Sequence, residues 1–150
     1  MKGIAHRQVF HELVDPEKVA EIASLMPIRI IEHNFHTNLA KILECKPNTG
    51  FLAIYHLLGQ GPKKLSIYGF SFYLDGFLPG QKAGIEKEKN CTEQEFADMA
   101  FNSKRHVQKN MWKYAKQTLL NNEKVSLDPV LEKILNLQDF NRESFEKIKL

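Results

Sequence analysis

Residues 47–75 read PNTGFLAIYHLLGQGPKKLSIYGFSFYLD, and this stretch decides the fold. The polar turn Pro47-Asn48-Thr49-Gly50 offers side-chain oxygens that can cap a helix, and the apolar run Phe51 to Leu58 predicts that helix. Gly59-Gln60-Gly61-Pro62 combines flexible residues with a helix breaker, so the helix is expected to end there. Leu65 to Tyr68 is the predicted strand, and the sequence GFSFY follows its carboxyl end.

The flanking sequence continues the alternation of helices and strands. Upstream, Asp15-Pro16-Glu17 begins a predicted helix over residues 16–25, and the β-branched run Ile28 to Glu32 predicts a short buried strand. Residues 33–46 are ambiguous, with a short helix expected around Leu39 to Leu43. Downstream, the expected elements are a helix over Lys104 to Leu120, a strand over Val125 to Leu127, and helical pieces starting near Asp128 and Asn141.

Residues 76–103 have a different character, because glycines and a proline precede a charged run. They predict a mobile, lid-like surface loop with at most a short helix near Glu93 to Ala100. The remaining elements predict an α/β fold with a largely parallel sheet flanked by helices. Ligands bind such sheets beyond the carboxyl ends of the strands, and both the PNTG and the GFSFY segments lie near such ends.

Composition limits the class of protein. With 150 residues and 43% hydrophobic side chains, the chain is expected to form a single domain over residues 1–150. A net charge of +3 on scattered Lys and Arg residues is too weak to indicate a nucleic-acid partner. Two cysteines, Cys45 and Cys91, favour free thiols in a reducing compartment. Lacking a signal-like segment and an apolar run of about 20 residues, the chain is expected to be cytoplasmic, with peripheral membrane association left open.

The turn Pro47-Asn48-Thr49-Gly50 is the first candidate binding site. Unpaired N–H groups at the start of a helix favour a phosphate or carboxylate, and Gly50 lets a ligand approach the backbone closely. On these four residues alone, an ordinary capped turn is the more frequent explanation. The sequence that follows the turn makes a ligand-binding site the favoured interpretation.

The stretch from Pro47 to Gly76 resembles the small sialyl motif of sialyltransferases. That motif joins a Pro-Ser-Thr-Gly-like turn, an apolar helix, a polar connector and a strand ending in Tyr-Gly-Phe. Farther on, Lys104-Arg105-His106 lies where these families place a catalytic histidine, and the segment Lys124 to Asp128 matches their closing strand. The similarity covers roughly residues 28–135. It implies a Rossmann-like, GT-A-like fold, of which this chain would be the C-terminal portion.

The resemblance also implies an activity and a set of site residues. Sialic acid or a related keto-sugar would move from a donor activated by cytidine monophosphate (CMP) to a glycan hydroxyl, with inversion and without a metal or other cofactor. Tyr73 would donate a hydrogen bond to the departing phosphate, and His106 would be the general base, a role that histidine fills more often than any other side chain. The implied donor-binding residues are Asn48, Thr49, Gly50, Gly69 and Phe70.

Some positions depart from the family pattern. Asn48 replaces the usual serine or threonine, Met111 replaces an acidic residue, and Ser71 replaces the aspartate of the bacterial pattern. The cysteine of the animal enzymes is missing near Gln60-Gly61, which places the chain nearer the bacterial or viral type. No Gly-Asn-Gly-like nucleotide loop occurs before Ile28, so the chain is expected to be a piece of a larger enzyme or a diverged relative.

Two other functions remain open. One is a non-catalytic binding or regulatory module derived from such an enzyme, and the other is an unrelated α/β domain that binds a protein or nucleic acid. His33, His36 and Cys45 fall short of a zinc pattern, so a metal site is not predicted. His56 belongs to the predicted apolar helix, where a core or rim position is expected.

Overall fold

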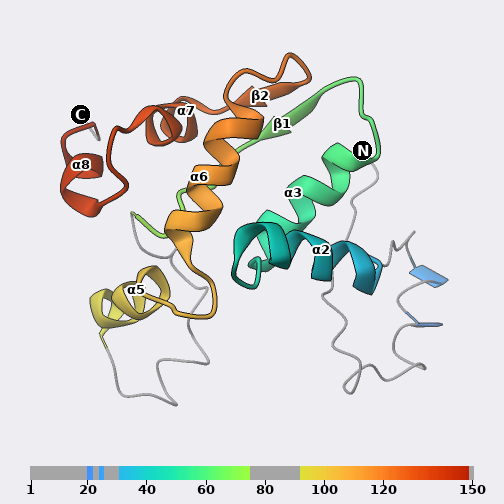
Figure 1. The fold of residues 1–150 in the computed structure, drawn as a ribbon, viewed down its shortest axis with the longest axis horizontal. Coiled ribbons are helices and arrows are strands. Elements are labelled where there is room, and N and C mark those ends of the chain that lie inside the picture. The colour runs from blue at the N-terminus through green and yellow to red at the C-terminus, as the bar shows by residue number, and fades with distance from the viewer. Residues whose placement is uncertain (1–19, 22–23, 26–30, 75–91, 149–150) are drawn as a thin grey trace.

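The computed structural model describes residues 20–21, 24–25, 31–74 and 92–148, and Figure 1 shows how their helices and strands are arranged. The predicted helix over residues 16–25 and most of the predicted loop over 76–103 lie outside these residues. The predicted strand from Ile28 to Glu32 is described only at its last two positions. Neither is part of a strand there, because Glu32 already serves as the N-cap residue of helix α2.

Two helices precede the sheet. Helix α2 (His33–Leu43) begins farther upstream than predicted, because its polar residues lie on an exposed face while Leu39 and Leu43, four positions apart, are buried. Helix α3 (Thr49–Gly59) confirms the predicted capped helix and ends at the predicted breaker, where Gly61 has a φ of 65°.

The sheet consists, within the described residues, of strands β1 (Leu65–Ile67) and β2 (Val125–Leu127). They pair in parallel with Leu65 opposite Val125 and Ile67 opposite Leu127, which confirms both predicted strands. Parallel neighbours require a crossover connection, and the described residues of this connection contain two helices. The fold is therefore a mixed helix and strand structure with a small parallel sheet flanked by helices.

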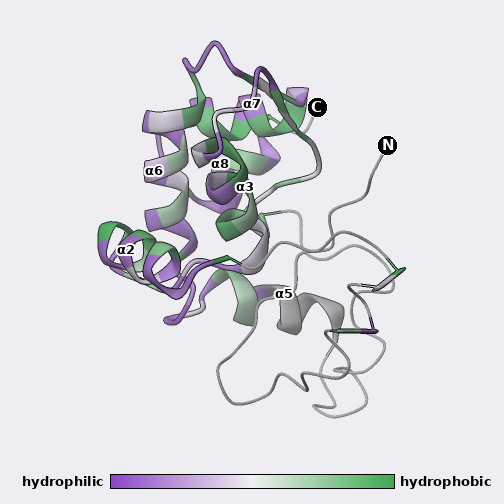
Figure 2. Ribbon diagram, turned by 90° about the vertical axis from the view of Figure 1, so that its right-hand side faces the viewer, coloured by the Kyte–Doolittle hydropathy of each residue, from purple (hydrophilic) through white to green (hydrophobic). Residues whose placement is uncertain are grey.

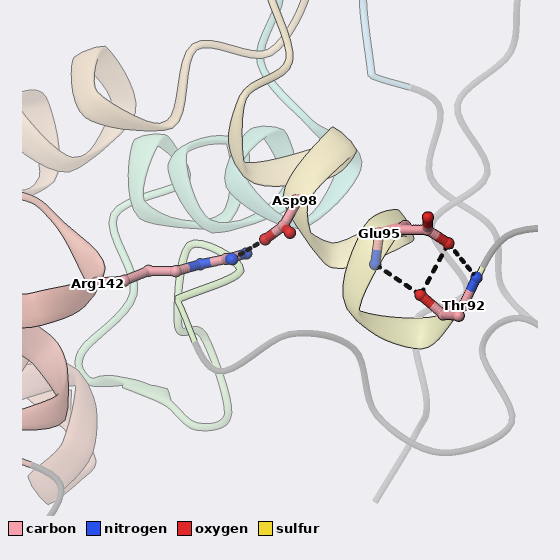
Figure 3. Close-up of polar contacts among 4 residues, drawn as sticks. All are labelled: Thr92, Glu95, Asp98 and Arg142. Carbon is pink, nitrogen blue, oxygen red and sulfur yellow. Dashed lines mark hydrogen bonds and ion pairs between the residues drawn. The ribbon is translucent and has the colours of Figure 1, made fainter.

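Helix α5 (Glu93–Phe101) confirms the short helix predicted near Glu93 to Ala100. Thr92 and Glu95 form a capping box at its start, and Figure 3 shows the reciprocal bonds between them. The Asp98 carboxylate pairs with Arg142, which begins helix α8 (Arg142–Glu146), and so ties α5 to the C-terminal part of the chain (Figure 3).

Helix α6 (Gln108–Leu119) supplies much of the core. Met111, Ala115 and Leu119 recur at helical spacing and are buried, whereas the opposite face is polar, as the colours of Figure 2 show. Helix α7 (Pro129–Asn136) packs against α6, and Trp112 Nε1 donates to the Ile134 carbonyl at 2.9 Å. Helices α7 and α8 confirm the two predicted C-terminal helical pieces.

The described helices include none that has both the length and the apolar character needed to cross a bilayer.

Candidate active site

The turn between α2 and α3, residues 46–50, lies at the centre of the candidate site. Pro47 is fully buried and anchors the turn in the core. The Asn48 side chain caps α3 by accepting a backbone N–H three positions on, at 2.8 Å, a role that asparagine fills as well as serine. Thr49 and Gly50 are exposed and begin the helix, whose first N–H groups find no partner within it. An anion is therefore favoured at this end of α3.

The loop that leaves β1 packs directly against this turn. A Cβ atom added to Gly50 would meet Phe70 Cε2 at 3.0 Å, so any larger residue there would have to displace the ring. The structure thus brings together Gly50 and Phe70, two of the predicted donor-binding residues. Gly69, another of these predicted residues, has a φ of 70°, a conformation that glycine adopts without steric cost.

Two non-glycine residues of the same loop have a left-handed backbone conformation. Phe72 has a φ of 54° and Tyr73 a φ of 59°. Such conformations cost about 1–3 kcal/mol each and concentrate at functional sites. Packing holds them, because the Phe72 side chain is 2% exposed and its ring meets those of Phe70 and Phe140 edge-on, with centroids 4.8 and 5.9 Å apart.

Tyr73 is the predicted hydrogen-bond donor to the departing phosphate. Its side chain is partly buried, and this burial raises the pKa of the Tyr73 hydroxyl above its ordinary value. The hydroxyl therefore keeps its proton at neutral pH and remains able to donate, as the predicted role requires.

Asp128 joins the two strand ends at the carboxyl edge of the sheet. One carboxylate oxygen caps α7 by accepting the N–H groups of Val130 and Leu131, at 2.8 and 2.9 Å. The other accepts the Gly69 N–H at 2.8 Å. The sequence indicated Asp128 only as a helix start, because its second bond exists only through the parallel pairing of the strands.

His106, the predicted general base, lies next to the opposite end of the turn. Its ring Nδ1 is 2.8 Å from the carbonyl oxygen of Lys46, and the Lys46 N–H donates to the Arg105 carbonyl at 3.1 Å. Because a carbonyl oxygen only accepts hydrogen bonds, Nδ1 carries the proton of the neutral ring. The Nε2 atom is then the nitrogen whose lone pair can take a proton.

The position of His106 corrects one prediction. We expected the residue to begin a helix running from Lys104 to Leu120, but α6 begins only at Gln108. The preceding segment instead pairs with Lys46 through backbone bonds, and the Ser103 side chain accepts the His106 N–H at 3.1 Å. These contacts hold residues 104–106 outside the helix.

Met111 stands where the sialyltransferase pattern has an acidic residue. Its side chain is 0% exposed and belongs to the hydrophobic core. An unpaired carboxylate at such a position would be strongly disfavoured, because removing a charge from water is costly. The methionine therefore matches its surroundings in this fold.

The predicted residues flank the turn from two directions, with His106 on one side and the exit loop of β1 on the other. Two surface cavities resolved among the described residues, of about 380 and 80 Å³, lie elsewhere, beside α7 and Ile148. None of the predicted site residues lines either of them.

The side chains considered for metal binding serve other purposes. Cys45 directs its thiol to the Val107 carbonyl at 3.8 Å, and burial raises the pKa of that thiol. Across the described part of the chain, no group of three or more His, Cys, Asp or Glu side chains could hold a metal ion. His56 is buried in α3, as expected, with its ring edge-on to that of Phe35.

Comparisons of the chain with models of protein families, with curated proteins and with solved structures find no match. The functional conclusion therefore depends on the residues and their geometry.

Proposed function

We propose that this chain is a sialyltransferase-like glycosyltransferase, or part of one, that transfers sialic acid or a related keto-sugar from a CMP-activated donor to a glycan hydroxyl. The observation that carries the proposal is the position of the turn 46–50. It contacts His106 through Lys46 and Phe70 through Gly50. The resemblance to sialyltransferases assigns donor binding to the turn and to the segment that contains Phe70. It assigns the general base to His106. A Rossmann-like, GT-A-like fold is part of the same proposal, and the parallel pairing of β1 with β2 supports it.

In the proposed reaction, His106 Nε2 accepts the proton of the acceptor hydroxyl as the acceptor oxygen bonds to the anomeric carbon of the donor. The bond from that carbon to the CMP phosphate breaks, and its electron pair leaves with the phosphate. Attack from the opposite face inverts the configuration. The Lys46 carbonyl supports this role of His106, because it fixes the tautomer and stabilises the imidazolium that forms.

The donor side offers groups that suit a departing phosphate. The start of α3 presents the positive end of the helix dipole, which favours a negative charge. Tyr73 adds a neutral hydroxyl that can donate. Donors fixed in place before the reaction stabilise the charge that develops on the leaving group.

A second candidate is a non-catalytic binding module derived from such an enzyme. The buried Met111 favours it, because the family's acidic partner of the catalytic histidine is absent at this position. This module would bind CMP through the turn 46–50 without transferring a sugar.

Calorimetric titration with CMP, combined with a transfer assay using CMP-sialic acid, tests both candidates. Gly50→Val should weaken CMP binding, because its side chain would collide with Phe70 at the start of α3. Lys113→Ala, on the exposed face of α6, is the matched control and should bind CMP normally. Transfer supports the enzyme, CMP binding without transfer supports the module, and a chain that binds no CMP would contradict both.

A further inference from the structure

Gln108 is a buried polar residue next to the proposed base. It is the first residue of α6 and is only 2% exposed. Its side-chain Nε2 donates a hydrogen bond to the backbone carbonyl of His106 at 2.8 Å. The amide nitrogen must be the atom that faces His106, because a carbonyl oxygen accepts hydrogen bonds and cannot donate one. Gln108 is therefore bonded directly to the residue that carries the proposed base.

The other amide atom of Gln108 is left without a partner. Oε1 is buried and accepts no hydrogen bond from the residues that the structure describes. A buried acceptor without a partner costs free energy, so such atoms are rare and call for an explanation. Methionine has a similar length and would bury no unpaired oxygen, although it would release the His106 carbonyl. Stability therefore gives little preference for glutamine at this position, whereas the bond to His106 requires a donor.

The bond from Gln108 completes a set of contacts that hold His106. The His106 N–H donates to Ser103 Oγ at 3.1 Å, and the ring Nδ1 donates to the Lys46 carbonyl at 2.8 Å. Together with the carbonyl bonded by Gln108, three of the four polar groups of His106 have partners. The fourth is Nε2, the atom that accepts a proton in the proposed reaction. The contacts thus fix the residue on every side except the one that reacts.

The carbonyl bond matters for the ring because His106 lies just outside a helix. Val107, the N-cap residue of α6, makes no side-chain capping bond, as expected for an apolar residue at this position. The side chain of Gln108 instead fixes the peptide that follows His106. Rotation of this peptide would turn the His106 backbone and carry Nδ1 away from the Lys46 carbonyl.

We propose that Gln108 is a positioning residue for the proposed base. Through the His106 carbonyl it keeps Nδ1 on the Lys46 carbonyl and leaves Nε2 for the proton of the acceptor hydroxyl. The task of Nε2 rests on the proposed glycosyl transfer, but the orientation of the ring can be measured without any substrate.

Nitrogen NMR of the full chain tests the orientation of the ring. Above the pH range in which histidine titrates, it shows which ring nitrogen of His106 carries the proton. In the unmodified chain the proton should reside on Nδ1. In Gln108→Met the ring should leave the Lys46 carbonyl, so the proton should divide between the two nitrogens. A proton on Nε2 in the unmodified chain, or an equal preference for Nδ1 in the variant, would overturn the proposal.

Gln117→Met is the matched control, because it makes the same substitution at an exposed position of the same helix. This control should keep the His106 proton on Nδ1. A thermal melt then separates positioning from a purely structural role. Gln108→Met should melt close to the control, because the lost bond is offset by removal of the unpaired Oε1. A variant that melts far below the control would overturn the proposal, because Gln108 would then serve the fold.

A transfer assay with CMP-sialic acid relates the ring to the reaction. Gln108→Met should lower kcat by up to about 100-fold, the effect of a small misplacement of a reacting group. The KM for CMP-sialic acid should not change, because the proposed donor-binding groups lie at the start of α3 and after β1. An unchanged kcat in an active chain would overturn the positioning role. A displaced ring proton in a chain that transfers no sugar would contradict the proposed function but leave the control of the His106 ring by Gln108 standing.

Discussion

The two loops that flank the turn 46–50 are held by opposite kinds of interaction. The loop before α6 is joined to its neighbours by polar contacts, including the Lys46 N–H donating to the Arg105 carbonyl at 3.1 Å. The loop after β1 is held by aromatic packing around Phe72, which maintains a strained backbone. The proposed base is therefore oriented by polar contacts near the surface, whereas the donor-binding side is held in place by packing in the hydrophobic core. Substitutions in the first loop should change the chemistry, and those in the second should change stability.

The largest expected effect comes from the proposed base. His106→Ala should reduce transfer by about 10²–10⁴-fold, the usual contribution of a general base. The melting temperature should change little, because the backbone hydrogen bond between Lys46 and Arg105 remains. Initial rates with CMP-sialic acid and a thermal melt provide the two measurements. Lys113→Ala is the control for both, and undiminished transfer by His106→Ala would remove the residue from the mechanism.

Substitutions in the loop after β1 should change the stability of the fold. Phe72→Ala should lower the free energy of unfolding by about 3–5 kcal/mol, because it removes a buried ring and leaves the strained backbone in place. Tyr68→Ala, at a side chain that is 74% exposed, should stay within about 0.5 kcal/mol. Denaturant titration measures both variants. If the two lost similar stability, the loop would not depend on core packing.

A smaller loss of stability is expected from substitution of Asp128, which joins the two strand ends. Asp128→Ala should cost about 1–2 kcal/mol, because it removes the cap of α7 and the acceptor of the Gly69 N–H. Asp128→Asn keeps one side-chain oxygen for the cap and should lose less. Denaturant midpoints of the two variants measure the difference, and an alanine variant as stable as the asparagine variant would show that the cap contributes nothing.

The smallest effect concerns pH. The pKa of His36 is lower in the folded chain than its ordinary value of 6.5, so the unfolded chain binds the proton more readily. The contribution of His36 to stability is therefore fully present above pH 6.5 and declines as the pH falls toward the lowered pKa. His36→Gln should flatten this part of the stability curve, measured as the melting temperature between pH 7.5 and 5. An unchanged slope would mean that the pKa of His36 does not differ between the folded and the unfolded chain.

Much of the local structure follows from short sequence signals. The Asn48 cap, the breaker after Gly59, the strands and the Asp128-Pro129 helix start were all predictable, because capping, periodicity and proline act over a few residues. The start of α6 was not predictable in the same way. Helix-compatible residues precede Gln108, but their backbone groups bond to Lys46, which is distant in the sequence.

The candidate site also has features that were predictable from the sequence and features that were not. Its residue types and their order came from the sequence motif, which named Gly50, Phe70, Tyr73 and His106. The contact of Gly50 with Phe70 followed only from the tertiary structure. So did the participation of Lys46, whose carbonyl gave no signal of its own because every residue has one.

The sequence by itself determined the helix α3, the strands β1 and β2 and the helix start at Asp128-Pro129, because capping, periodicity and proline depend on near neighbours along the chain. Only the tertiary structure decided the tautomer of His106, the second bond of Asp128 and the strained exit of β1. Each of these depends on a partner from a distant segment. Such partners meet only when the buried faces of the helices pack into one core.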